Sequence, residues 1–78
     1  MKKFIAMYVD ISDSSDLRPR ILGIFDNRET AVSEIHADID TFCEANDIEP
    51  KSSMYDTLSA SDEYDNISCK WNIGEVEI

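Results

Sequence analysis

The sequence predicts an α+β domain in which a small antiparallel β-sheet of three or four strands carries one α-helix on one face. Apolar and polar residues alternate near both ends of the chain, which is the pattern of half-buried strands. Between these segments, apolar residues recur every three or four positions, as on one side of a helix. The expected order is ββα(β)β, with the 78 residues forming a single acidic domain over 1–78.

The first two strands are expected at 4–11 and 20–25, joined by a polar loop that contains a proline. Side chains alternate between the faces of a strand, so Phe4, Ala6 and Tyr8 share one face of the first strand. The residues between them are also apolar, so both faces of this hairpin need cover. One helix covers one face, because a helix packs on a sheet from one side.

The second apolar face of the hairpin therefore needs cover from residues 50–60, from a second copy of the chain, or from a partner. The simpler alternative is that its apolar residues are ordinary exposed ones. Cover by a second copy or by a partner supports a homodimeric or subunit module as an alternative function. The residues expected to form that interface are Phe4, Ala6, Tyr8, Leu22 and Ile24.

The helix is expected to begin at Asp26, with Asp26 as its cap and Glu29 completing a D-x-x-E capping box. It is expected to fade near Asn46, and Pro50 prevents its continuation. The apolar stripe of this helix consists of Val32, Ile35, Ile39 and Phe42, flanked by Ala31 and Cys43.

Residues 52–60 fit two structures. Met54 and Leu58 lie on one side of a helix, and the alternation around them fits a strand equally well. The last strand is expected at 67–73, and a one-residue bulge at Gly74 would explain why the apolar positions change parity after it.

Two segments carry a resemblance to a group of proteins. They are GIFDNRETA at 23–31 and WNIGEVEI at 71–78. This combination of a hairpin end, a helix start and a closing strand resembles small ββα-type proteins of bacterial and phage genomes that have no agreed function. The resemblance implies the fold and such an origin, and it implies no catalytic activity. Some phage proteins of this size inhibit host enzymes, which is an analogy of size and origin.

The net charge of −10, from 17 acidic and 7 basic residues, opposes direct binding to nucleic acid or to anionic membranes. It favours a basic protein surface as the partner. No Lys or Arg occurs between Glu29 and Pro50. The leading hypothesis is a non-enzymatic interaction domain whose acidic face binds a basic patch, as a nucleic-acid mimic or an inhibitor of a nucleic-acid enzyme would. The simpler alternative is that the acidity only maintains solubility.

The expected acidic face combines carboxylates from the helix and from two loops. Its residues are Glu29, Glu34, Asp38, Asp40, Glu44, Asp47, Asp13, Asp16, Asp62, Glu63 and Asp65.

The stretch DISDSSD at 10–16 is rich in oxygen ligands but lacks the glycine and the final glutamate of an EF-hand loop. Weak divalent-cation binding is therefore the third hypothesis. His36 is the only histidine, and with Cys43 and Cys69 it forms neither a zinc motif nor a catalytic motif. We expect no cofactor, no resident metal and no enzymatic activity. The absence of a long apolar segment leads us to expect a cytoplasmic protein.

Overall fold

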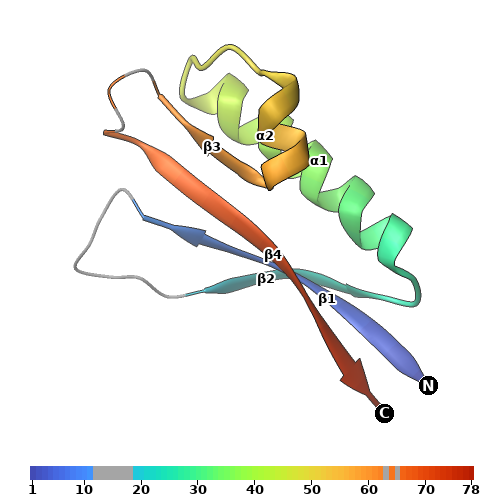
Figure 1. The fold of residues 1–78 in the computed structure, drawn as a ribbon. Coiled ribbons are helices and arrows are strands. Elements are labelled where there is room, and N and C mark those ends of the chain that lie inside the picture. Colours follow the sequence, from blue (N-terminus) through green and yellow to red (C-terminus); the bar gives the residue numbers. More distant parts are fainter. Residues whose placement is uncertain (12–18, 63, 65) are drawn as a thin grey trace.

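The computed structural model describes residues 1–11, 19–62, 64 and 66–78. The described elements are β1 (Lys2–Asp10), β2 (Arg20–Phe25), α1 (Arg28–Ala45), α2 (Ser52–Thr57), β3 (Ser59–Ser61) and β4 (Ser68–Glu77). The strands form one antiparallel sheet in the order β2-β1-β4-β3. Figure 1 shows α1 crossing one face of the sheet, with the short α2 beside it. The predicted fold class is therefore confirmed.

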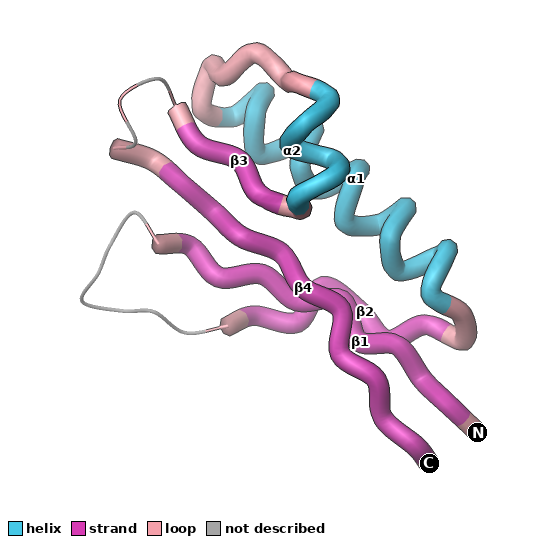
Figure 2. The backbone as a smooth tube through the Cα atoms, viewed as in Figure 1, coloured by secondary structure: helices cyan, strands magenta, loops and turns pink. Residues whose placement is uncertain are grey.

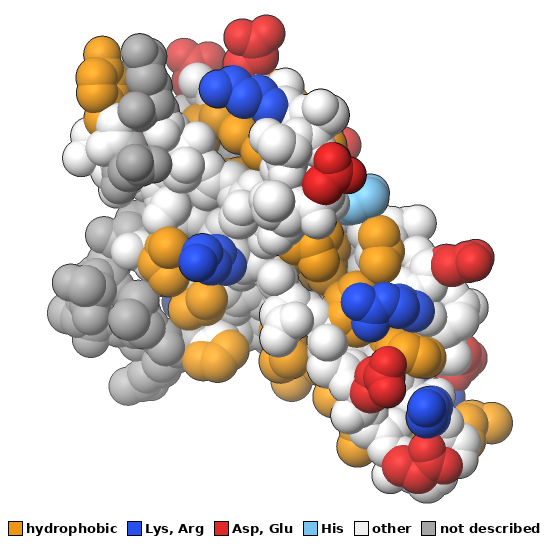
Figure 3. All heavy atoms as spheres, in the orientation of Figure 1, with side chains coloured by type: hydrophobic (Ala, Val, Ile, Leu, Met, Phe, Trp, Pro, Cys, Tyr) orange, Lys and Arg blue, Asp and Glu red, His pale blue; other side chains and the backbone are white. Residues whose placement is uncertain are grey.

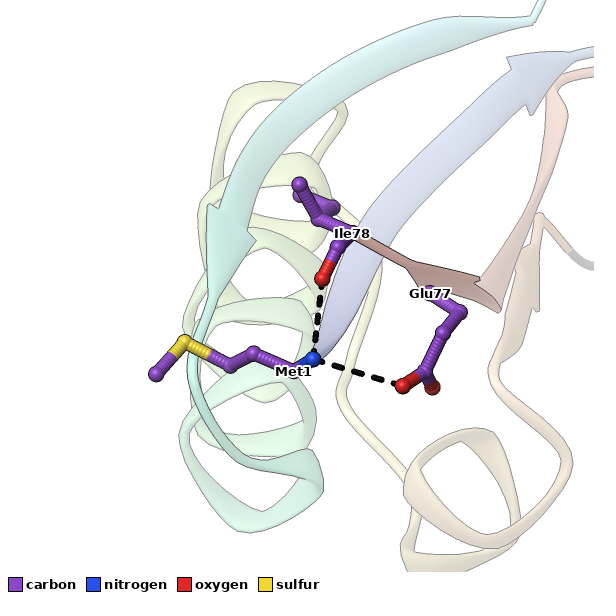
Figure 4. Close-up of polar contacts among 3 residues, drawn as sticks. All are labelled: Met1, Glu77 and Ile78. Atoms are coloured by element: carbon purple, nitrogen blue, oxygen red, sulfur yellow. Dashed lines mark hydrogen bonds and ion pairs between the residues drawn. The ribbon is translucent and has the colours of Figure 1, made fainter.

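The two central strands, β1 and β4, pair without interruption from Lys2 opposite Glu77 to Asp10 opposite Cys69. Figure 2 shows that this pairing brings the two ends of the chain together at one end of the sheet. The amino group of Met1 donates to the Ile78 carbonyl at 2.9 Å and lies 3.3 Å from Oε1 of Glu77 (Figure 4). The predicted bulge at Gly74 is wrong, because Gly74 lies in regular register opposite Ile5.

The helix α1 begins one residue later than expected. Asn27 has an extended backbone, and its Oδ1 accepts hydrogen bonds from the N–H and the hydroxyl of Thr30, both at 2.8 Å. Asn27 is thus the N-cap, since it satisfies a backbone donor that has no partner within the helix. The expected cap, Asp26, is wrong; its carboxylate instead forms an ion pair with Lys3.

The core lies between α1 and the sheet. Ile35 and Ile39 of α1 are fully buried, and on β4 Trp71 is 5% exposed. The ring of Phe42 meets the Trp71 ring edge-on, with centroids 5.7 Å apart, which is a favourable aromatic geometry. Apart from Val32, which is not part of this core, the predicted apolar stripe of α1 packs on the sheet. The buried core residues are Ala6, Ala31, Ile35, Ile39, Cys43, Met54, Ala60, Cys69 and Trp71.

The hairpin face that was expected to be open is the face that α1 covers. The expected apolar interface is therefore wrong. Ala6 is fully buried, and Phe4, Tyr8 and Leu22 pack against the core beneath α1. Of the five residues expected at that interface, Ile24 alone is exposed, at 60%.

A register shift in β2 accounts for this distribution. Ala6 pairs with Gly23, but the next residue of β1 pairs with Ile21, so Leu22 is one extra residue in β2. A bulge of this kind breaks the strict alternation of side chains. Leu22 therefore joins Phe25 on the covered side, and Ile21 joins Ile24 on the other side.

Residues 52–60 contain both of the structures that their pattern allows. Ser52–Thr57 is helical, and Ser59–Ser61 is a strand. Leu58 separates them in the left-handed conformation, with φ 54° and ψ 49°, which ends α2 and turns the chain into β3. Because Met54 of α2 is buried in the same core as α1, this segment extends the helical layer and leaves the second sheet face open.

Candidate functional site

The sheet surface that faces away from α1, which we call the open sheet face, carries no carboxylate at its described strand positions. Strand registers define these positions, because directly paired residues project to the same side of a sheet. They are Lys3, Ile5, Met7, Val9, Ile21, Ile24, Ser59, Ser61, Ser68, Lys70, Asn72, Gly74 and Val76. In a chain with a net charge of −10, this surface is therefore neutral to weakly basic.

On the open sheet face, apolar side chains dominate the central strand β1 and the edge strand β2. Ile21 and Ile24 are 63% and 60% exposed, and Ile5, Met7 and Val9 are half-buried. A shallow hollow of about 350 Å³ borders Met7 and Val9. Hydrophobic side chains are visible among the strands in Figure 3. Contiguous apolar residues on a protein surface can mark a site of association, so this surface is a candidate for association.

The carboxylates of the long strands occupy the opposite set of positions. Asp10 pairs with Cys69, Glu75 with Phe4 and Glu77 with Lys2, all on the side of the sheet that bears α1. The acidic residues are thus separated from the apolar surface within the same strands. Parity alone did not reveal this arrangement in the sequence, because both sides of β1 are apolar.

The described members of the expected acidic face differ in their surroundings. On α1 and just after it, the exposed ones are Glu29, Glu34, Asp40, Glu44 and Asp47. Asp38 is half-buried, and its Oδ2 accepts a hydrogen bond from the Trp71 indole at 2.7 Å. This carboxylate therefore supports the core, a role that sequence spacing gave no means of detecting.

Asp40 is exposed, and its Oδ1 accepts a hydrogen bond from the Tyr55 hydroxyl. This bond raises the pKa of Tyr55, with desolvation and the negative charge of Asp40 adding to the effect. The bond joins α1 to α2, and a second contact reinforces it. The His36 ring packs edge-on against the Tyr55 ring at 5.3 Å, and its Nε2 lies 3.2 Å from the Tyr55 carbonyl oxygen.

The two acidic loops contribute one described member of the expected face. Asp62 accepts hydrogen bonds from the backbone N–H groups of Asn66 at 2.7 Å and Ile67 at 3.3 Å, so it closes the turn before β4. The other loop members lie outside the described residues: Asp13, Asp16, Glu63 and Asp65. A common face of helix and loops stays a prediction, as does cation binding by DISDSSD. In Figure 3 the visible acidic side chains are separated, with basic ones between them.

The two cysteines are buried free thiols on the covered side. The Sγ of Cys43 lies 3.7 Å from the Sδ of Met54. Burial raises the pKa of Cys69 to about 12, with Asp10 and Asp38 adding to it, and burial also raises the pKa of Cys43. A raised pKa keeps a thiol protonated, which disfavours its use as a nucleophile or a metal ligand.

Within residues 1–11, 19–62, 64 and 66–78, no three His, Cys, Asp or Glu side chains are grouped as metal ligands. Over the same described residues, no helix has both the length and the apolar character needed to cross a membrane.

A groove of about 820 Å³ lies at the other end of the helical layer, and the sequence pattern did not reveal it. It is lined by the connection between α1 and α2, by α2, by β3, and by Asp62 and Tyr64 after β3. The available signal was the number of small hydroxyl side chains between 52 and 61, which leave space beside a strand.

Comparisons of this chain with protein-family models, with curated proteins and with solved structures each found no match. The resemblance to small ββα-type proteins therefore stays a prediction.

Proposed function

We propose that the protein is an interaction domain that associates with a second copy of itself through the open sheet face. One observation carries the proposal. The chain has 17 acidic residues, yet the described positions of this face hold none, while they hold Ile5, Met7, Val9, Ile21 and Ile24. Burying exposed aliphatic side chains is the main favourable contribution to most protein association.

A second copy is repelled least in this orientation. Two chains of charge −10 repel each other, and the repulsion is smallest where the contacting surfaces carry no carboxylates. Two sheets pack face to face about 10 Å apart. A two-fold axis lets the same surface serve both partners. The helix α1 and its exposed carboxylates then point away from the interface on both copies.

The test replaces an exposed isoleucine by a carboxylate. Ile24→Glu places a charge at a position that is 60% exposed, so it leaves the core of the monomer intact. Ser33→Glu is the matched control, because Ser33 is exposed on α1 and the change in net charge is the same. In analytical ultracentrifugation we expect a dimer for the wild type and for Ser33→Glu, and a monomer for Ile24→Glu. A wild-type chain that sediments as a monomer at roughly 0.5 mM would refute the proposal.

Salt provides a second criterion. Association through an uncharged face between acidic chains strengthens as salt screens their repulsion. Binding of a basic partner to carboxylates weakens as salt rises. We therefore expect the dimer fraction to increase between low and physiological ionic strength, and a decrease would contradict the proposed interface.

A second candidate function is the binding of a basic protein patch by α1, and the carboxylates of this helix, which form no ion pair with another described residue, favour it. The ion pairs between described residues are Met1–Glu77 and Lys3–Asp26, so neither involves an α1 carboxylate. Glu29, Glu34 and Glu44 remain exposed on this helix. In this function the protein would act as a nucleic-acid mimic or an inhibitor of a nucleic-acid enzyme.

The test of this second function is an inhibition assay on a panel of nucleic-acid enzymes. We expect inhibition that declines as salt rises and that Glu34→Lys with Glu44→Lys abolishes. Inhibition that is unchanged by this double variant would exclude α1 as the binding surface.

A further inference from the structure

The groove of about 820 Å³ follows the outer edge of β3. This strand is at one end of the strand order β2-β1-β4-β3, so one of its two edges has no neighbouring strand among the described residues. The groove is lined by all three residues of β3 and, across from them, by residues of α2 and of the preceding connection. Figure 1 shows β3 between β4 and these elements. The free edge of β3 therefore borders a space large enough for an extended chain.

The hydrogen-bond register shows which backbone groups point into this space. Trp71 donates its backbone N–H to the carbonyl of Leu58 at 2.8 Å, and Asp62 donates to the carbonyl of Ile67 at 3.0 Å. In an antiparallel ladder, bonded residues alternate along the strand, so Ala60 also faces β4. Ser59 and Ser61 then direct their N–H and C=O groups away from β4, toward the groove.

The walls of the groove allow another backbone to approach closely. Ser53 and Thr57 face it from α2, and their side chains are small. The Thr57 hydroxyl donates to the Ser53 carbonyl at 2.8 Å and lies 2.9 Å from the Ser59 hydroxyl, so this wall is internally ordered. Small, ordered walls beside a free strand edge match the requirements for adding a strand from another chain.

The charge of the groove selects the kind of chain that it fits. Asp47, Glu49 and Asp62 line it, whereas Lys51 is the single cation among its described lining residues. Asp47 and Glu49 are exposed on the connection after α1. An extended segment that carries Lys or Arg would meet three carboxylates and one ammonium group, so charge complementarity favours a basic partner over a second copy of this acidic chain.

We propose that the edge of β3 binds an extended, basic segment of another protein, which adds to the sheet as a fifth strand. The backbone groups of Ser59 and Ser61 bind its main chain, and the carboxylates of Asp47, Glu49 and Asp62 bind its cationic side chains. This site uses the backbone at the outer edge of β3, whereas the proposed homodimer rests on the aliphatic side chains of β1 and β2, so the site does not depend on the homodimer.

The probe is a short capped peptide in which lysine alternates with valine. Two control peptides accompany it. The first keeps the charges but has methylated backbone nitrogens, which prevents strand addition. The second replaces lysine with glutamate. In amide-resolved NMR titrations, we expect the unmethylated lysine–valine peptide to protect the N–H groups of Ser59 and Ser61 from exchange, and we expect neither control to do so.

A proline variant tests the backbone contact directly. Ser61→Pro removes an N–H that points into the groove and leaves the ladder to β4 complete, so proline is tolerated at this edge position. We expect roughly a fivefold to tenfold loss of affinity for the peptide, with an unchanged melting temperature. Unchanged affinity in a folded Ser61→Pro variant would overturn the proposal.

A charge variant keeps the proposal testable if the proline variant does not fold. Asp47→Asn with Glu49→Gln removes two carboxylates at the groove, and Glu29→Gln with Glu34→Gln removes two from the distant part of α1. We expect roughly a threefold to tenfold loss of affinity for the first pair and a smaller loss for the second. Equal losses, or equal binding of the methylated peptide, would show nonspecific attraction and overturn the proposal.

Two other binding arrangements would give different results: a second copy of the chain in the groove, and the peptide on the open sheet face. In the monomeric Ile24→Glu variant without any peptide, protection of Ser59 and Ser61 that grows with protein concentration would place a second copy in the groove and contradict the proposal. Peptide binding that is the same for Ile24→Glu and for the wild type would support a site independent of the dimer. Binding that is lost in Ile24→Glu would instead assign the peptide to the open sheet face.

Discussion

Isoleucine residues on the two sides of the sheet have different fates. On the covered side, Ile35 and Ile39 are fully removed from water between α1 and the strands. On the open side, Ile21 and Ile24 are 63% and 60% exposed. The same side chain therefore contributes to the stability of the monomer on one side, and on the other it is available for association. The difference teaches that the apolar content of such a small chain is not all devoted to its own core.

Charge divides between the sides in the same way. On the covered side, Asp38 accepts the indole hydrogen bond of Trp71, so one carboxylate is built into the core boundary. On the open side, the described strand positions hold lysine, serine and asparagine as their polar residues. Substitutions on the two sides should therefore change different measured properties, and the following predictions use that contrast.

The largest difference should come from truncating isoleucine on each side. Ile39→Ala leaves a cavity beneath α1 and should reduce the free energy of unfolding by about 2–5 kcal/mol. Ile24→Ala, measured at a concentration low enough for monomers, should change it by less than about 0.5 kcal/mol. Urea unfolding followed by circular dichroism measures both. Ile39→Val, with an expected loss of about 0.5–1.5 kcal/mol, serves if Ile39→Ala is unfolded. Comparable losses at both positions would remove the distinction between the two sides.

A smaller effect should follow from breaking the bond between Asp38 and Trp71. Asp38→Ala leaves the buried indole N–H without an acceptor and should cost about 1–3 kcal/mol. Asp38→Asn retains an acceptor and should recover most of that loss. Glu34→Ala, one helical turn earlier on the exposed surface, is the control and should have little effect. If Asp38→Ala and Glu34→Ala are equally mild, Asp38 belongs to the solvated acidic surface after all.

Alkaline pH should lower the free energy of unfolding through groups on the covered side of the sheet. Cys69 has its pKa raised to about 12 in the folded protein by burial, so it keeps its proton where the unfolded chain loses it. The folded state then binds more protons than the unfolded state, and stability is complete below about pH 9 and declines from there toward pH 12. The raised pKa values of Cys43 and Tyr55 act in the same direction. Urea midpoints measured at several alkaline pH values should fall, and Cys69→Ala should show a shallower decline.

The sequence was sufficient for the elements but not for the choice of the covered face. The three-and-four spacing of α1 and the alternation of β4 each depend on residues close together in the chain, so these elements were predicted. Both sides of β1 are apolar, so alternation gave no criterion for which side α1 would cover. The extra residue at Leu22 then reversed the parity of β2. An isolated glycine in a strand can mark a bulge, but the pattern did not tell Gly23, which has the bulge beside it, from Gly74, which lies in regular register.

The candidate surfaces were predictable only in part for a related reason. The exposed carboxylates of α1 follow from helical geometry, and Glu29, Glu34 and Glu44 are exposed as expected. Asp38 and Asp40 are engaged by Trp71 and Tyr55, which are 33 and 15 positions away in the chain. Such contacts depend on tertiary packing. The groove at β3 was missed because its carboxylates and free backbone groups come from separate elements.

The smallest predicted effect is on the free energy of unfolding when one charge is removed from each side of the sheet, and its direction should differ between the two sides. Glu44 lies in the last turn of α1, which contains no basic residue, and it follows Asp40 by four positions. A carboxylate there opposes the helix dipole and a neighbouring like charge. Glu44→Gln should therefore stabilise the protein by about 0.5 kcal/mol. Lys70→Gln on the open sheet face removes a cation from a chain of charge −10 and should destabilise it slightly.

Salt distinguishes this electrostatic explanation from a packing explanation for the two variants. At about 1 M salt the screening length falls to about 3 Å, so both differences from the wild type should nearly vanish. A Glu44→Gln effect that persists at high salt would mean that the gain comes from helix propensity or local contacts. A stabilising Lys70→Gln would mean that the few cations of the open sheet face do not relieve the repulsion among the carboxylates on the other side.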